Sequence, residues 1–133
     1  MRTEIYVVTT KLDEHIKGKR KCFGNFWRCG KRGEDCPEET ECCYFDVANE
    51  RRETLEAIKL EIMHEFGGMT EIPNCKGYWE DNGLFFTDNV NLWLIYAYSK
   101  NTKETIEAFA KRIKELTWQK SQAFTIDGMM YLV

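Results

Sequence analysis

Apolar residues recur at helical spacing in two parts of this chain, and each recurrence predicts an amphipathic helix. The first helix is predicted from about residue 49 to 66, with one apolar face: Leu55, Ile58, Ile62 and Phe66. Gly67-Gly68 follows directly and is typical of a helix C-terminus, because glycine adopts the left-handed conformation without steric cost. The second helix is predicted from about residue 101 to 118, with the face Ile106, Phe109, Ile113 and Leu116.

Around these helices, β-branched and aromatic residues alternate as strands do. Residues 3–10 predict a first strand, and residues 76–81 and 84–98 predict two more, joined by Asn82-Gly83. Asn-Gly between such runs predicts a type I′ hairpin turn, in which both central residues have positive φ. The strand after this turn has apolar residues on both faces, with Leu92 and Leu94 on one and Trp93 and Ile95 on the other, so we expect it to lie inside the sheet with both faces covered.

The chain closes with a strand over residues 122–126, an Asp127-Gly128 turn and a short extension over 129–133. The elements therefore follow the order strand, irregular segment, helix, strand, strand, helix, strand. This order predicts an α+β fold, a ferredoxin-like βαββαβ sandwich in which two helices cover one face of an antiparallel sheet. We expect one domain over residues 1–133, with residues 11–45 as an insertion between the first strand and the first helix.

The middle hairpin resembles known families. Gly77-Tyr78-Trp79, followed by the turn at Gly83 and a hydrophobic strand, resembles the hairpin of several small uncharacterised ferredoxin-like (split βαβ) families. The resemblance covers the chain outside residues 11–45. It implies a fold and no activity, because this fold hosts many unrelated functions.

Sulfur is concentrated in the predicted insertion. Five of the six cysteines lie there and the sixth lies on the predicted sheet: Cys22, Cys29, Cys36, Cys42, Cys43 and Cys75. Six-residue spacings that lead to adjacent cysteines partly resemble a cystine-knot segment, which implies disulfides. A structural zinc ion held by four of the insertion's cysteines is the alternative, although no Cys-x-x-Cys pair occurs, and free thiols are the third. No other cofactor is expected.

Composition narrows the setting of the protein. The chain is 43% hydrophobic and 31% charged with a net charge of −3, values typical of a globular domain with its own core. No apolar run has the length of a membrane span, so we expect no membrane partner. The N-terminus carries no signal peptide, which predicts a cytoplasmic protein, or one of an oxidising compartment if the cysteines form disulfides. The size and the long loop suit a small accessory protein of viral or archaeal type.

Two groups of side chains are candidates for binding. The first lies in the insertion, where cations and aromatic rings suit phosphates and bases: Phe26, Trp27, Arg28, Lys31 and Arg32. The second lies on the predicted sheet: Tyr78, Trp79, Trp93 and Tyr96. Alternation places part of this second group on the face away from the helices, which needs a cover. We expect a homodimer through this sheet face or burial beneath the insertion, ahead of a ligand or stacked bases.

No catalytic motif stands out. His64-Glu65 lacks the second histidine of a metalloprotease helix, and Glu80-Asp81 fits a solvated turn. The sequence therefore predicts a non-enzymatic binding or regulatory protein that recognises a protein or small-molecule partner through the insertion and the aromatic sheet face. The alternatives are nucleic-acid binding by the basic insertion, and a small enzyme with its site at the interface of a sheet-packed dimer.

Overall fold

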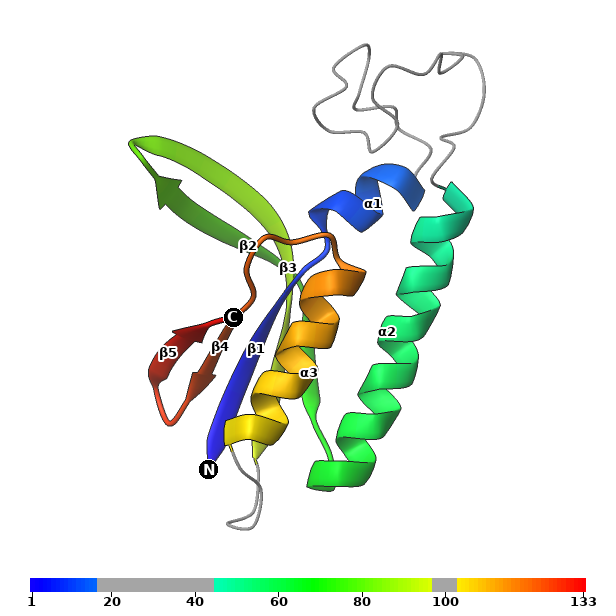
Figure 1. Ribbon diagram of the computed structural model, residues 1–133, viewed down its shortest axis with the longest axis vertical. Coiled ribbons are helices and arrows are strands. Elements are labelled where there is room, and N and C mark those ends of the chain that lie inside the picture. Colours follow the sequence, from blue (N-terminus) through cyan, green and yellow to red (C-terminus); the bar gives the residue numbers. More distant parts are fainter. Residues whose placement is uncertain (17–44, 97–102) are drawn as a thin grey trace.

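The computed structural model describes residues 1–16, 45–96 and 103–133, and Figure 1 shows helices packed on one side of a twisted sheet. These ranges contain both helices and strands. Their bounds are β1 (Arg2–Val8), α1 (Thr10–Ile16), α2 (Phe45–Phe66), β2 (Thr70–Asp81), β3 (Leu84–Tyr96), α3 (Lys103–Leu116), β4 (Ala123–Ile126) and β5 (Met129–Leu132).

The strands form one antiparallel sheet in the order β2-β3-β1-β4-β5, which places the first strand at its centre. β1 pairs with β3 along its whole length, from Arg2 opposite Tyr96 to Val8 opposite Val90. On its other side β1 pairs with β4, where Ile5 lies opposite Phe124. These pairings confirm the predicted α+β class and the antiparallel sheet.

The predicted turns occur where glycine and its neighbour allow positive φ. Asn82 and Gly83 join β2 to β3 with φ of 51° and 80°, and these two positive values are what a type I′ turn requires. Asp127 and Gly128 join β4 to β5 in the same way, with φ of 49° and 85°. Gly67 ends α2 with φ of 89°, as predicted.

The core lies between the helices and one face of the sheet. The predicted apolar face of α2 is confirmed, since its four members are at most 5% exposed: Leu55, Ile58, Ile62 and Phe66. The sheet contributes alternate residues of three strands: Ile5, Val7, Trp93, Ile95 and Phe124. Within the described ranges, no helix is long and apolar enough to cross a membrane.

The helix α1 was not predicted, because it lies in a stretch assigned to the insertion. Thr9 caps it: its carbonyl oxygen accepts the Asp13 N–H at 2.8 Å, and its hydroxyl donates to the Asp13 carboxylate at 3.0 Å. Leu12 is 2% exposed and anchors the helix in the core. This seven-residue helix has two apolar residues in its sequence, Leu12 and Ile16, which are too few to reveal an apolar period.

The prediction that the strand after Asn82-Gly83 has both faces covered is wrong for the described residues. Trp93 and Ile95 face the helices and are buried, whereas Leu92 and Leu94 are only half-buried and Tyr96 is 65% exposed. β3 is an inner strand, as expected, but the helices cover one of its two faces (Figure 1).

We expect Gly77→Ala to destabilise the protein by about 1–3 kcal/mol, the usual cost of overpacking. A Cβ at this position of β2 would lie 3.0 Å from two atoms of the Trp79 indole and 3.0 Å from Val90 Cγ2. Urea denaturation followed by circular dichroism measures the loss.

A double-mutant cycle with Trp79→Leu identifies the cause of this loss. If the indole is the main obstacle, the cost of Gly77→Ala falls in the Trp79→Leu background, because the smaller side chain leaves room. An unchanged stability of the single Gly77→Ala variant would contradict the packing described here.

Candidate functional site

A cavity of about 290 Å³ lies where α2 faces the bulged end of β2 and the middle of β3. Its volume is near the lower end of the range for small-molecule sites. Residues from two of the described ranges, 1–16 and 45–96, line it: Val7, Thr9, Leu12, Asp13, Arg52, Leu55, Glu56, Lys59, Glu71, Pro73, Asn74, Asn91 and Trp93. The lining combines an indole, two amides and charges of both signs with an apolar floor.

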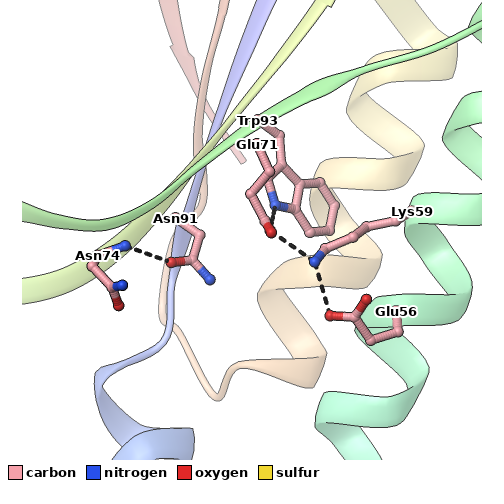
Figure 2. Close-up of polar contacts among 6 residues, drawn as sticks. All are labelled: Glu56, Lys59, Glu71, Asn74, Asn91 and Trp93. Carbon is pink, nitrogen blue, oxygen red and sulfur yellow. Dashed lines mark hydrogen bonds and ion pairs between the residues drawn. The ribbon is translucent and has the colours of Figure 1, made fainter.

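A chain of polar contacts crosses this cavity from the sheet to the helix, as Figure 2 shows. The indole nitrogen of Trp93 donates to Glu71 Oε2 at 2.8 Å. Lys59 Nζ lies 2.8 Å from the same Glu71 oxygen and 2.8 Å from Glu56 Oε1, so it bridges the two carboxylates. The ammonium also lies 5.7 Å from the centre of the Trp93 ring, within cation–π range.

The arrangement is that of a bound cation, because two carboxylates and an aromatic ring surround one ammonium group. Lys59 is 18% exposed and Glu71 28% exposed, whereas Glu56 at 64% lies toward solvent. Burial works to lower the pKa of Lys59, but its hydrogen bonds to Glu56 and Glu71 and the attraction of their charges outweigh burial and raise the pKa above its ordinary value.

A β-bulge shapes the other wall of the cavity. Ile72 pairs with Leu92 and Cys75 with Val90, so three steps along β2 match two along β3. Asn74 takes φ of 58° in this irregularity, a conformation that asparagine tolerates better than most residues. Its N–H donates to Asn91 Oδ1 at 3.2 Å (Figure 2). The bulge thus brings a second polar group to the rim, as bulges beside binding sites often do.

Polar groups next to the cavity fix α1 against β3. Asn89 Nδ2 donates to Asp13 Oδ2 at 3.2 Å, and Thr10 Oγ1 donates to Asp88 Oδ1 at 2.8 Å. The Asn89 N–H in turn donates to Thr10 Oγ1 at 2.9 Å. Because Asp13 also lines the cavity, these bonds hold its carboxylate in place.

A second hollow, of about 470 Å³, lies between α2 and α3. Its two arginines already have partners: Arg112 pairs with Glu61 at 2.6 Å, and Arg51 Nη1 donates to the Glu115 carbonyl oxygen at 2.6 Å. It offers no aromatic ring in its lining. The cavity at Trp93 is therefore the better candidate site.

The structure separates the sheet aromatics that were predicted as binding residues. Trp93 lies in the cavity, but Tyr96 is exposed on the opposite face of the sheet. Tyr78 is 76% exposed on the hairpin arm, by which we mean the ends of β2 and β3 on either side of the Asn82-Gly83 turn. Trp79, on the same arm, is half-buried over Gly77. The predicted residues of the insertion lie outside the described ranges: Phe26, Trp27, Arg28, Lys31 and Arg32.

Five of the six candidate disulfide or metal ligands also lie outside the described ranges: Cys22, Cys29, Cys36, Cys42 and Cys43. Cys75, the described one, carries a free thiol that lies 3.5 Å from the Ile72 carbonyl oxygen. Among the described residues, no group of three or more His, Cys, Asp and Glu side chains could hold a metal ion. The choice between disulfides and zinc stays a prediction.

Most residues of the cavity were missed by sequence reasoning. Glu56 and Lys59 look like an ordinary surface pair on a helix, and Glu71 follows the helix end without any motif. Two signals were present. Asn91 lies two residues before Trp93 and therefore on the same face of the strand, where a polar residue is unexpected beside the core. Pro73-Asn74 interrupts a strand, which indicates a bulge.

Comparison with known proteins finds similarity to one solved structure, that of an enzyme. No protein-family model matches the sequence, and a search of curated proteins gave no match. Among solved structures, the chain is similar to a phage SAM lyase in complex with S-methyl-5′-thioadenosine. The sequences are 15% identical, with a TM-score of 0.52 over 99% of this chain and 87% of that chain. At this identity the similarity shows a common fold alone.

The prediction of a non-enzymatic binding protein is contradicted by this comparison, because the structural neighbour is an enzyme. The sequence argument required a recognisable catalytic motif. The cavity described above is lined by single residues of β1, α1, α2, β2 and β3, and such a set leaves no motif in the sequence.

We expect Lys59→Met to destabilise the protein by about 1–2 kcal/mol at neutral pH, because it leaves the Glu71 carboxylate without its cation; partial exposure keeps the loss below that of a fully buried pair. Because the pKa of Lys59 is raised in the folded protein, the stabilisation by this bridge decreases at high pH. The stabilisation is complete below pH 10.5, the ordinary pKa of lysine, and it is lost as pH rises through the raised pKa. Urea denaturation of both proteins at neutral pH and above the lysine pKa tests this.

The matched control is Arg112→Met on α3, which removes the exposed pair with Glu61 of α2. We expect a loss of at most about 1 kcal/mol that stays constant over the same pH range, because arginine remains charged there. A pH-independent difference for Lys59→Met would contradict the bridge.

Proposed function

We propose that this protein is a small enzyme that cleaves S-adenosylmethionine (SAM) at a carbon–sulfur bond and releases S-methyl-5′-thioadenosine. The observation that carries the proposal is the cavity at Trp93, in which two carboxylates and the indole surround the ammonium group of Lys59. The similarity to a phage SAM lyase over nearly the whole chain supports the choice of substrate.

The charges of SAM complement those of the cavity. SAM carries a sulfonium and an ammonium, which suit the carboxylates of Asp13, Glu56 and Glu71 and the face of Trp93. Its carboxylate suits Lys59 and Arg52, and Lys59 has a flexible stem that allows it to change partner.

The remaining parts of the ligand also have partners. The amides of Asn74 and Asn91 supply donors and acceptors for a ribose or an adenine, and Val7, Leu12 and Pro73 supply apolar contact. A mixed lining of this kind suits a zwitterionic nucleoside better than a purely apolar or purely anionic ligand.

Cleavage of SAM needs no water and no oxidant. The electron pair of the broken carbon–sulfur bond stays on sulfur, which becomes a neutral thioether. The carbon is then taken by the carboxylate oxygen of the substrate itself, which closes a lactone, or the neighbouring carbon gives a proton to a carboxylate base, which leaves an alkene. In the lactone route a sulfonium and a carboxylate neutralise each other, so a partly buried site favours the transition state over the charged substrate.

In this proposal Glu71 holds the sulfonium next to the Trp93 face. Its position is set by the indole N–H and by Lys59, both at 2.8 Å. Lys59 and Arg52 orient the carboxylate of the substrate. For the alkene route, Glu71 would also be the candidate for the base.

The finer fold assignment belongs to the same proposal. We infer that β1, α2, β2, β3, α3 and β4 form a ferredoxin-like unit, to which α1 and β5 are additions. The order of the four strands, β2-β3-β1-β4, with antiparallel neighbours throughout, supports it.

The test is incubation of the purified full chain with SAM, followed by liquid chromatography and mass spectrometry for S-methyl-5′-thioadenosine. We expect protein-dependent release, and the second product decides the route: homoserine lactone, or an unsaturated amino acid with release of a proton. Glu71→Gln keeps the shape of the side chain but removes its charge, and we expect it to lower kcat/KM at least about tenfold.

The matched control is Glu61→Gln, the same chemical change on an exposed residue of α2 that pairs with Arg112, and we expect it to keep the activity. Thermal melting shows whether each variant is folded. Release no faster than without protein, together with no binding of SAM by calorimetry, would overturn the function. Equal activity of Glu71→Gln and the wild type would keep the enzyme but move its site.

A further inference from the structure

The face of the sheet away from the helices is apolar, although the described residues leave it open to solvent. All three described helices lie on the other face (Figure 1). Because strand side chains alternate, the neighbours of the core residues point to the uncovered side. We name this the open face; its apolar members are Tyr6, Ile72, Leu92, Leu94, Tyr96, Met130 and Leu132.

The strand registers join these side chains into one surface. Ile72 lies opposite Leu92, and Leu92 lies opposite Tyr6, so one row crosses β2, β3 and β1. A second row follows from Leu94 through Glu4 and Thr125 to Met130, across β3, β1, β4 and β5. The surface therefore spans the full width of the sheet.

The exposed fraction of this surface is large. Ile72, Tyr96, Met130 and Leu132 are 42%, 65%, 50% and 67% exposed. These four side chains alone present on the order of 500 Å² of surface, which is as large as the largest apolar patch of a typical monomer. With the half-buried members and the two charged residues of this face, the total approaches the roughly 800 Å² that each partner contributes to a standard interface.

We propose that the open face is the interface between copies of this chain. Its charges favour a second copy over another partner. Arg2 and Glu4 are its charged side chains on the central strand, one of each sign, and they pair loosely at 3.9 Å. The face is therefore neutral although the chain carries a net charge of −3. Two such faces do not repel each other, and Arg2 of one copy can meet Glu4 of the next.

Packing of two open faces gives a sandwich with the sheets inside and the helices outside. Sheets stacked in this way lie about 10 Å apart and interdigitate the side chains of their inner faces. The cavity at Trp93 lies on the helix side, so this inference is independent of the proposed chemistry.

The test is the mass of the full chain in solution, measured by sedimentation and by light scattering from dilute samples up to about 100 µM. We expect an oligomer. Leu132→Glu and Met130→Glu place a charge on the open face at exposed positions of the edge strand β5, and each should weaken association at least tenfold.

Two control variants carry the same kind of change at exposed apolar residues elsewhere. Leu60→Glu lies on α2, where Leu60 is 64% exposed, and Phe85→Glu lies on the hairpin arm, where Phe85 is 82% exposed. We expect both to keep the oligomer. Circular dichroism shows whether each dissociated variant remains folded.

The inference is supported if the chain forms a closed oligomer, of any number of copies, that dissociates in the β5 variants and persists in the two controls. A monomer at every concentration would overturn it, and would mean that another part of the chain or a different partner covers the face. An oligomer that Leu60→Glu or Phe85→Glu disrupts as strongly as the β5 variants would also overturn it, because the contact would then lie on α2 or on the hairpin arm.

Discussion

The burial of one indole determines how the candidate site is built. Trp93 is 1% exposed and belongs to the core, yet its N–H needs an acceptor, as in most buried tryptophans. Glu71 supplies that acceptor, and its carboxylate in turn needs a cation at the edge of the core. Lys59 supplies the cation and engages Glu56 on the solvent side. Each group thus satisfies the one before it, from the core outward to the mouth of the cavity.

This sequence of requirements explains why charged residues gather at a position that the fold could have filled with apolar side chains. A leucine in place of Glu71 would leave the indole N–H without an acceptor at the edge of the core. The bulge at Asn74 has a related effect on the other wall, since it turns a backbone N–H toward the Asn91 amide. The polar wall of the cavity is consequently part of the packing of the domain, and it is also the surface that a charged ligand would meet.

The elements of the fold were predictable because their signals are local. The apolar spacing from Leu55 to Phe66 and the Asn82-Gly83 turn each depend on residues that are adjacent in the chain. The site was not predictable to the same extent, because Lys59 and Glu71 meet only after α2 packs on the sheet. Of the residues that line the cavity, Trp93 alone was predicted as a binding residue, because it is aromatic and not because of its contact with Glu71. Pro73-Asn74 was the available clue, since a proline inside a strand points to a break in pairing.

Strand alternation ties the two faces of the sheet together. Glu71, Asn91 and Trp93 face the cavity, and each is followed directly by a residue of the open face: Ile72, Leu92 and Leu94. A substitution at Ile72, Leu92 or Leu94 would disturb the cavity as well as the open face, because the strand backbone at these residues also holds the walls of the cavity. Met130 and Leu132 differ in this respect. They lie on β5, separated from β3 by β1 and β4, and none of the residues that line the cavity belongs to β4 or β5. The far edge of the sheet is therefore where the open face can be altered while the geometry at Trp93 is left intact, so association and chemistry can be examined one at a time.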